Sequence, residues 1–291
     1  MNVVTDITGR NLRLYFRDRL NVFFSLLGAL VLFLLYTLFL GNQQTQGLAE
    51  TFPLAAEEDI KGLVDAWMFA GIVGITAITT GLAAVNVIVE DTATGRFRDF
   101  LVSPINRWQL VLGYLLSTVV IALIMTTVVF AVSLAYLALV DGVSLTAGQL
   151  ARTYGYLVLS CIAFGALSAF VVTFVRTPGS FAALSTLVGT ILGFAAGSYI
   201  PVGAFPEGVR NFVSALPFMQ ASMVVRREMT DGPLSAVTDQ PEAMEEVQRL
   251  FGITAHVGDW AVPTGYVLLV LAAMAVVFTA LAAVRIRSRI R

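Results

Sequence analysis

Residues 66–107 read AWMFAGIVGITAITTGLAAVNVIVEDTATGRFRDFLVSPINR, and the change of character inside this stretch decides the fold. Its first part, residues 66–88, carries no charge and is long enough to cross a bilayer, because a spanning helix needs about 20 apolar residues. Its second part, residues 90–107, is a charged island too small to be a domain, and another long apolar run follows it. The stretch therefore predicts two membrane-spanning helices joined by a short polar loop.

The whole chain has the composition of an integral membrane protein. Of its 291 residues 57% are hydrophobic and 13% are charged, with a mean hydropathy of +0.83, whereas soluble globular proteins have about 25% charged residues. Lys61 is the only lysine beside many arginines, a bias that favours a GC-rich bacterial genome. Cys161 is the only cysteine, so no internal disulfide can form and the thiol is expected to act as a small hydrophobe.

Six charge-free stretches are long enough to span the membrane: residues 22–41, 66–88, 109–140, 153–175, 181–200 and 261–284. The first is longer than a signal-peptide core of about 7–15 residues and has no cleavage site, so we interpret it as a retained anchor. The sequence thus predicts one domain over residues 1–291, an all-α integral membrane fold of six transmembrane helices.

The distribution of charge orients these spans. With six crossings both termini lie on one side, where the segments hold twelve arginines and five acidic residues. Cytoplasmic loops are enriched in Lys and Arg, so this side is expected to be the cytoplasm. A seventh crossing through residues 211–225 would invert the arginine-rich tail. We therefore expect residues 201–225 to be re-entrant and residues 226–260 to form an outer loop, with a helix from Pro241 to a stop at Gly252.

The charged island, residues 90–107, has the pattern of a short amphipathic helix. Asp91 or Thr92 can cap this helix, and Ser103 with Pro104 would begin the third span afresh. The apolar face follows the i, i+3, i+4 rule, with Phe97, Phe100 and Leu101. The residues that stay polar are Arg96, Asp99 and Arg107. A simpler interpretation is a solvated loop helix that rests on lipid headgroups.

Residues 1–21 repeat this theme and predict an interfacial helix. One stripe is apolar, with Leu12, Tyr15, Phe16 and Leu20. The other stripe is basic, with Arg10, Arg13 and Arg17. Simple anchoring by arginine and aromatic side chains would give the same pattern, and both interpretations can hold together.

A proline-rich run follows the fifth span. Its helix-breaking residues are Pro201, Pro206 and Pro217. Broken helices at the outer face can build a gate, although a plain proline-rich turn has the same composition. Small residues recur every four positions before the run, at Ser185, Gly189, Gly193 and Gly197. Such spacing lets helices approach closely, and we favour packing within the chain over a dimer contact.

Several kinds of chemistry are missing from the sequence. It holds no phosphate-binding loop motif, so the chain is not expected to bind a nucleotide. His256 is the only histidine, and the predicted spans hold no Asp, Glu, Lys or Arg, which disfavours catalysis, a metal site and ion-coupled transport. We expect neither a cofactor nor a nucleic-acid partner for this chain. A membrane-embedded lipid-modifying enzyme and a non-transporting scaffold remain open alternatives.

Taken together, these segments resemble the transmembrane subunit of ABC-2 type exporters, also called type V ABC transporters. The resemblance covers nearly the whole chain and is carried by the helix of residues 1–21, the six spans, the proline run and the loop of residues 90–107. The loop positions that match are Glu90, Asp91, Gly95, Leu101, Ser103, Pro104 and Arg107.

The resemblance implies a mechanism and a set of partners. The loop would be a cytoplasmic coupling helix that docks in a groove of a separate ATPase, and the proline run would form outer re-entrant helices. Two permease subunits, expected to be a homodimer, would work with two ATPase subunits that carry ATP and Mg. The complex would lie in the bacterial plasma membrane with both termini of this chain cytoplasmic.

The cargo is where the sequence is least informative. Weakly polar and aromatic side chains suit a path for hydrophobic or amphipathic cargo such as drugs, antibiotics, peptides or lipids: Thr76, Thr79, Thr80, Asn86, Phe194 and Tyr199. The threonines fit helix packing equally well. Lipid-linked polysaccharide is the alternative cargo that the resemblance allows.

Overall fold

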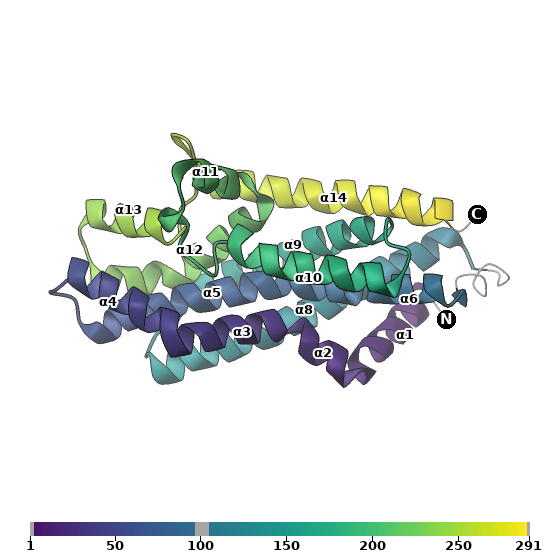
Figure 1. Cartoon of the computed structure of the whole chain (residues 1–291), viewed down its shortest axis with the longest axis horizontal. Helices are drawn as coiled ribbons and strands as arrows, with labels where there is room; N and C mark the ends of the chain where they lie inside the picture. The colour runs from purple at the N-terminus through teal and green to yellow at the C-terminus, as the bar shows by residue number, and fades with distance from the viewer. Residues whose placement is uncertain (1–2, 97–104, 290–291) are drawn as a thin grey trace.

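The computed structural model describes residues 3–96 and 105–289, and it is a bundle of helices that run along one long axis (Figure 1). Six helical stretches of the described chain are long and apolar enough to cross a membrane, which confirms the predicted all-α architecture. Of the predicted coupling residues, Phe97, Asp99, Phe100, Leu101 and Pro104 lie outside the described residues.

The N-terminal third forms one interrupted helical path. Its elements are α1 (Val3–Arg17), α2 (Arg19–Ser25), α3 (Leu27–Leu35), a π-helical turn (Tyr36–Leu40) and α4 (Gly41–Thr51). The spanning part is Leu27–Thr51, ten residues beyond the predicted end at residue 41. Polar residues after Gly41 still form a helix, because buried Leu48 packs into the bundle and the chain meets no proline before Pro53.

The π-helical turn is held open by Gly41. The backbone N–H of Gly41 donates to the carbonyl of Tyr36, five residues earlier, instead of four as in an α-helix. A Cβ at Gly41 would lie 2.7 Å from that carbonyl oxygen, so only glycine fits this turn.

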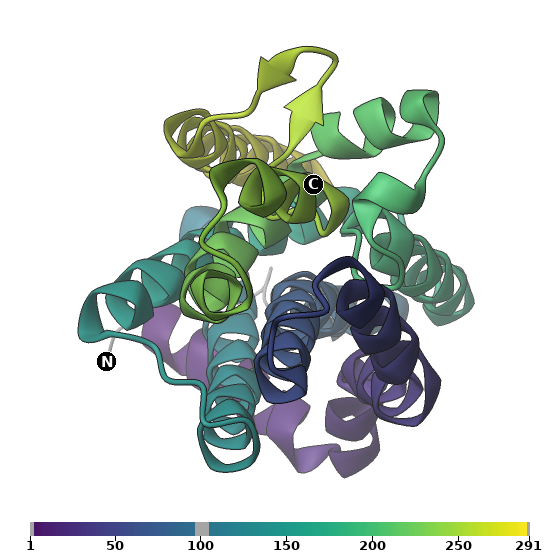
Figure 2. The same cartoon turned by 90° about the vertical axis from the view of Figure 1, so that its left-hand side faces the viewer.

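The second span is the centre of the bundle. It consists of α5 (Glu57–Ala84) and α6 (Asn86–Ala93), and α5 packs against α8, α9 and α12. Glycines allow the close approach: a Cβ at Gly81 would lie 3.4 Å from Gly165 Cα. Figure 2 looks along the long axis and shows other long helices of the bundle around this one. The helix begins well before the predicted residue 66, because Lys61 and Asp65 pair with each other at 3.0 Å across one turn.

The other long helices are α8 (Arg107–Val140), α9 (Ala147–Val172), α10 (Pro178–Ala195) and α14 (Thr264–Arg289). Ser103 and Pro104, at which the third span was predicted to begin, lie outside the described residues, and α8 begins at Arg107 after Asn106. The fifth span ends at Ala195, before the predicted residue 200, because Gly197 turns the backbone at φ +59°.

The region between α10 and α14 differs most from the prediction. It contains a 3-10 turn (Val202–Ala204), α11 (Glu207–Ala215), α12 (Pro217–Val237), α13 (Pro241–Leu250) and a hairpin of β1 (His256–Val257) and β2 (Trp260–Ala261). The predicted boundary between residues 225 and 226 is wrong, because α12 runs through it and buries Arg226 and Met229. The predicted outer helix does begin at Pro241.

Candidate functional site

A buried carboxylate lies where the second span meets the charged loop. Asp91, in the last turn of α6, is fully buried, and Arg10 of α1 donates to its two oxygens at 2.7 and 2.8 Å. The hydroxyl of Tyr114 on α8 donates to the same carboxylate. Two parallel charge-assisted hydrogen bonds are among the strongest that proteins make. Asp91 therefore ties α1, α6 and α8 to one point, which we call the inner cluster.

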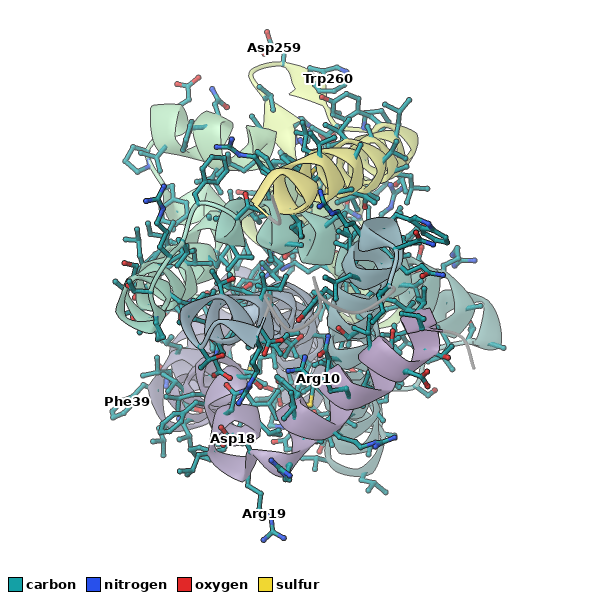
Figure 3. All side chains as sticks on the ribbon, turned by 90° about the vertical axis from the view of Figure 1, so that its right-hand side faces the viewer. Arg10, Asp18, Arg19, Phe39, Asp259 and Trp260 are labelled. Atoms are coloured by element: carbon teal, nitrogen blue, oxygen red, sulfur yellow. The ribbon has the colours of Figure 1, made fainter. Side chains whose placement is uncertain are left out.

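Further contacts hold α1 against α8 around the inner cluster. The side-chain amide of buried Asn11 donates to Ser117 Oγ at 3.0 Å. Ile7 packs so closely on Gly113 that a Cβ there would lie 2.7 Å from Ile7 Cγ2. The predicted interfacial helix is thus docked on the third span, and hydrogen bonding to Asp91 raises the pKa of Arg10. Figure 3 shows Arg10 directed into the bundle, whereas Arg19 beyond the turn points away from it.

Five of the predicted coupling residues are described, and one of them, Asp91, is the centre of the inner cluster. Asp91 and Thr92 lie inside α6, so the prediction that one of them caps a helix is wrong. Glu90 is exposed and accepts from Asn86 Nδ2 at 2.8 Å. Gly95 lies two residues after the end of α6 and has a positive φ of +75°. The two remaining members, Arg96 and Arg107, are exposed, and Arg96 approaches Asp91 at 3.4 Å.

A second buried charge lies on α12, in the other half of the bundle. Arg226 is fully buried, and its Nη2 donates to the carbonyls of Ala196 and Gly197, both at 2.8 Å, and to Ser198 Oγ at 3.0 Å. Within the described residues no carboxylate forms an ion pair with it. The last carbonyls of a helix carry partial negative charge, so Arg226 caps the C-terminal end of α10.

Aromatic rings enclose this guanidinium. Trp67 of α5 lies under it, 5.4 Å from the ring centroid to Cζ, and its indole N–H donates to the carbonyl of Phe251 at 2.6 Å. Tyr36 packs edge-on against Trp67 and donates to the carbonyl of Tyr199 at 3.3 Å. This outer cluster joins the first two spans, α10, α12 and the end of α13.

Glycines make the outer cluster possible. Gly197 and Gly252 both have positive φ, at +59° and +63°. A Cβ at Gly197 would lie 2.3 Å from Val202, and one at Gly252 would lie 2.5 Å from Met219. Gly197, the last of the evenly spaced small residues, thus packs within the chain, as Gly193 does against Tyr199, whereas a Cβ at Gly189 would meet nothing.

The predicted gate and path residues are not brought to one place. Pro201 is buried beside the outer cluster, Pro206 directly precedes α11, and Pro217 is the first residue of α12. Phe194 and Tyr199 pack edge to face at 5.2 Å near the same end. The path threonines instead bond their own helix: Thr76 to Ile72 at 2.8 Å, Thr79 to Ile75 at 3.1 Å and Thr80 to Thr76 at 2.6 Å. Asn86 lies beside the inner cluster, in a cavity of about 50 Å³.

Sequence reasoning missed both buried charges. Arg226 was assigned to the outer loop because the apolar stretch ends at Val225. The available signal was its place in a helical stripe with Met219, Met223 and Thr230, all of them buried. Asp91 was predicted as a residue of the charged loop, but its partner was not predicted, because Arg10 lies 81 residues away in the chain.

Comparison with known proteins places the chain in a family. The model of a family described as "ABC-2 family transporter protein" matches residues 36–284. The match contains Asp91, Tyr114 and Arg226, and it begins after α1. No curated protein matches the chain significantly. Among the described residues, no three His, Cys, Asp or Glu side chains are grouped so that they could hold a metal ion.

Proposed function

Because the chain belongs to the ABC-2 transporter family, we propose that it is the membrane permease of an ATP-driven exporter, worked by a separate ATPase. In this proposal ATP and Mg are held by the ATPase, and the charged loop after α6 is the part of this chain that the ATPase grips. The permease would act as a homodimer with two ATPases, in a bacterial plasma membrane, with both termini cytoplasmic.

The inner cluster is the observation that carries the proposal. The gripped loop leaves α6 just after Asp91 and re-enters at α8, and Asp91 binds α1 and α8 together. A displacement of the loop would therefore move three helices as one body. Figure 1 shows that α6, the start of α8 and both chain ends lie at the same end of the bundle. This arrangement suits a lever that a cytoplasmic motor pushes.

An apolar groove supports hydrophobic or amphipathic cargo such as drugs, antibiotics, peptides or lipids. A cavity of about 280 Å³ lies between α3, α5 and α8, and Leu26, Phe33, Phe69, Val132 and Tyr136 are among its lining residues. Such a groove can admit a molecule that arrives through the bilayer, since its apolar walls resemble the lipid tails that the molecule leaves.

The coupling part is tested with the double variant Phe97→Asp and Leu101→Asp, whose residues the sequence pattern places on the apolar face. We expect it to insert into the membrane normally and to lose co-purification with the proposed ATPase partner. The matched control is Phe212→Asp on α11, an exposed aromatic residue near the other end of the bundle. Retention of the ATPase by the double variant would refute the coupling assignment.

The cargo part is tested by the ATPase activity of the complex reconstituted in liposomes. We expect lipophilic compounds to stimulate ATP hydrolysis and a polar glycan to leave it unchanged. Stimulation by a lipid-linked glycan alone would replace the proposed cargo, and no stimulation by either would favour a scaffold.

A further inference from the structure

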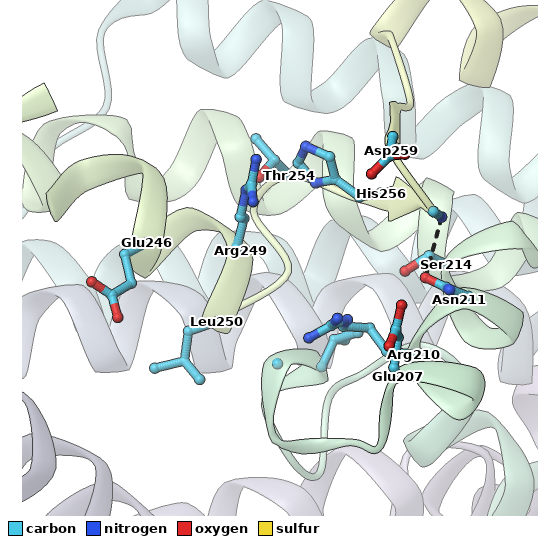
Figure 4. A pocket seen from close by; sticks show the side chains of 13 residues that line it. Glu207, Arg210, Asn211, Ser214, Glu246, Arg249, Leu250, Thr254, His256 and Asp259 are labelled. Atoms are coloured by element: carbon cyan, nitrogen blue, oxygen red, sulfur yellow. Dashed lines mark hydrogen bonds between the residues drawn. The ribbon is translucent and has the colours of Figure 1, made fainter. Parts of the chain in front are cut away.

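A polar cavity of about 610 Å³ opens between α11, α13 and the β1–β2 hairpin (Figure 4). Each of these elements contributes one basic and one acidic side chain to its lining: Glu207, Arg210, Glu246, Arg249, His256 and Asp259. The backbone N–H of Gly258 donates to Asn211 Oδ1 at 3.2 Å, which fixes the hairpin against α11. A volume of this size is in the range of sites that hold small molecules.

The charges around this cavity are largely unused by the protein. Within the described chain, Arg249 pairs with Glu245 at 2.7 Å, while Arg210, Glu207 and Asp259 form no ion pair. Thr254 lines the same cavity, and its buried hydroxyl has no hydrogen-bond partner among the residues that the structure describes. Burial and the two nearby arginines lower the pKa of His256. The site therefore offers donors and acceptors to a ligand.

Apolar side chains on the outside of the same elements place the cavity at a membrane surface. On α11, Val209 and Phe212 are exposed while its polar side chains line the cavity. Trp260 of the hairpin is exposed and packs edge-on against exposed Tyr266 at 4.9 Å. Amphipathic helices and Trp–Tyr pairs of this kind lie at the level of lipid headgroups.

We propose that this cavity binds a zwitterionic headgroup that carries both a phosphate and a primary amine, such as phosphoethanolamine. The phosphate lies against Arg210 and Arg249, and the ammonium lies against Glu207 and Asp259. A ligand with only negative charge would be repelled by the carboxylates of the lining. A ligand with only positive charge would be repelled by its two guanidiniums. Only a ligand with both charges matches the mixed lining. The site goes beyond export and does not depend on an ATPase.

The test measures binding of single lipids to the purified full chain by native mass spectrometry. We expect phosphatidylethanolamine to bind at least about tenfold more tightly than phosphatidylglycerol, and the variant Arg210→Gln with Arg249→Gln to lose about tenfold in affinity, as expected for hydrogen bonds to charged groups. The variant Glu207→Gln should reduce the preference for the amine-bearing lipid. The matched control is Arg227→Gln, an exposed arginine of α12 outside the cavity.

Soluble glycerophosphoethanolamine separates the two sources of the headgroup. Competition by this compound shows that the cavity accepts the free headgroup, and lipid binding without competition shows that it needs a lipid of the bilayer. Either result supports the site. Equal binding of both lipids by the wild-type chain, tight binding of a divalent cation in place of the lipid, or wild-type affinity in the double arginine variant would overturn it. Thermal melting checks that each variant is folded.

Discussion

The inner and outer clusters each bury one full charge, but they neutralise it in different ways. Asp91 has an opposite charge, Arg10, bound through two hydrogen bonds, and a tyrosine hydroxyl on its other side. Arg226 has, among the described residues, two backbone carbonyls, one serine hydroxyl, the sulfur of Met219 and the face of Trp67, none of them charged. Removal of one member of the ion pair strands a buried charge, whereas removal of Arg226 strands neutral carbonyls. The inner cluster should therefore be the more sensitive of the two.

The largest effect is expected from Arg10→Met. It leaves the Asp91 carboxylate buried without its main partner and should lower the free energy of unfolding by about 3 kcal/mol, the low end for a buried pair because Arg10 is partly exposed. Denaturation of the purified protein in detergent measures the change. Adding Asp91→Leu should restore much of the loss, since the stranded charge is then gone. A double variant less stable than Arg10→Met would contradict this account of the inner cluster.

A smaller effect is expected from Arg226→Met. Loss of the guanidinium takes a donor from the carbonyls of Ala196 and Gly197, and within the described chain only the Ala196 carbonyl keeps another, Ser198 Oγ at 3.5 Å, so the change should cost about 2 kcal/mol. Arg226→Lys keeps the charge and should recover part of that loss, because an ammonium also donates but cannot match the planar fork. The same denaturation assay compares how much free energy of unfolding is lost when each cluster is disrupted. If Arg226→Met proved more damaging than Arg10→Met, the comparison between ion pair and dipole cap would fail.

The backbone of the outer cluster is tested by Gly197→Ala. An alanine here would have to adopt a positive φ, and its Cβ would lie 2.3 Å from Val202 Cγ2. Together these should lower the free energy of unfolding by about 1–2 kcal/mol. Gly189→Ala on the preceding helix, α10, is the matched control, because a Cβ there meets nothing. It should be neutral or slightly stabilising, as alanine favours helix over glycine. Equal melting temperatures for the two variants would argue against the proposed strain at Gly197.

The smallest effect is expected from Tyr114→Phe. The change removes one hydrogen bond to Asp91 while the ion pair with Arg10 remains, so the loss should be about 1 kcal/mol. Combined with Arg10→Met, the loss from Tyr114→Phe should grow, because the hydroxyl is then the main donor to a buried charge. A strictly additive double variant would show that the two donors act independently.

The sequence was sufficient for the spans, since each long charge-free run became a spanning helix. It was also sufficient for α13, whose start at Pro241 follows from the fit of proline to the first turn. The helix ends were less predictable, because they were drawn at the first charged or polar residue. In α12 that rule stopped the helix at Val225, although the next residue, Arg226, is buried by capping another helix.

The candidate site was likewise predictable in part. Composition and spacing located the loop of residues 90–107, and only the fold could show that Asp91 meets Arg10 and Tyr114 inside it. Pairing of this kind depends on how helices pack, which a pattern along one helix does not contain. The charged lining of the outer cavity was out of reach for the same reason, because its residues come from three separate elements.

The π-helical turn at Tyr36–Leu40 accommodates one extra residue in the first span. Its bond spans five residues instead of four, so every side chain after Gly41 is rotated by about 100° relative to an unbroken α-helix. Tyr36, the first residue of the turn, and Leu48 after it both face the core in this register. Deletion of a single residue there would let the turn relax to an α-helix with Leu48 still facing the core, whereas a substitution of Gly41 that abolished the turn at full length would rotate Leu48 away from it.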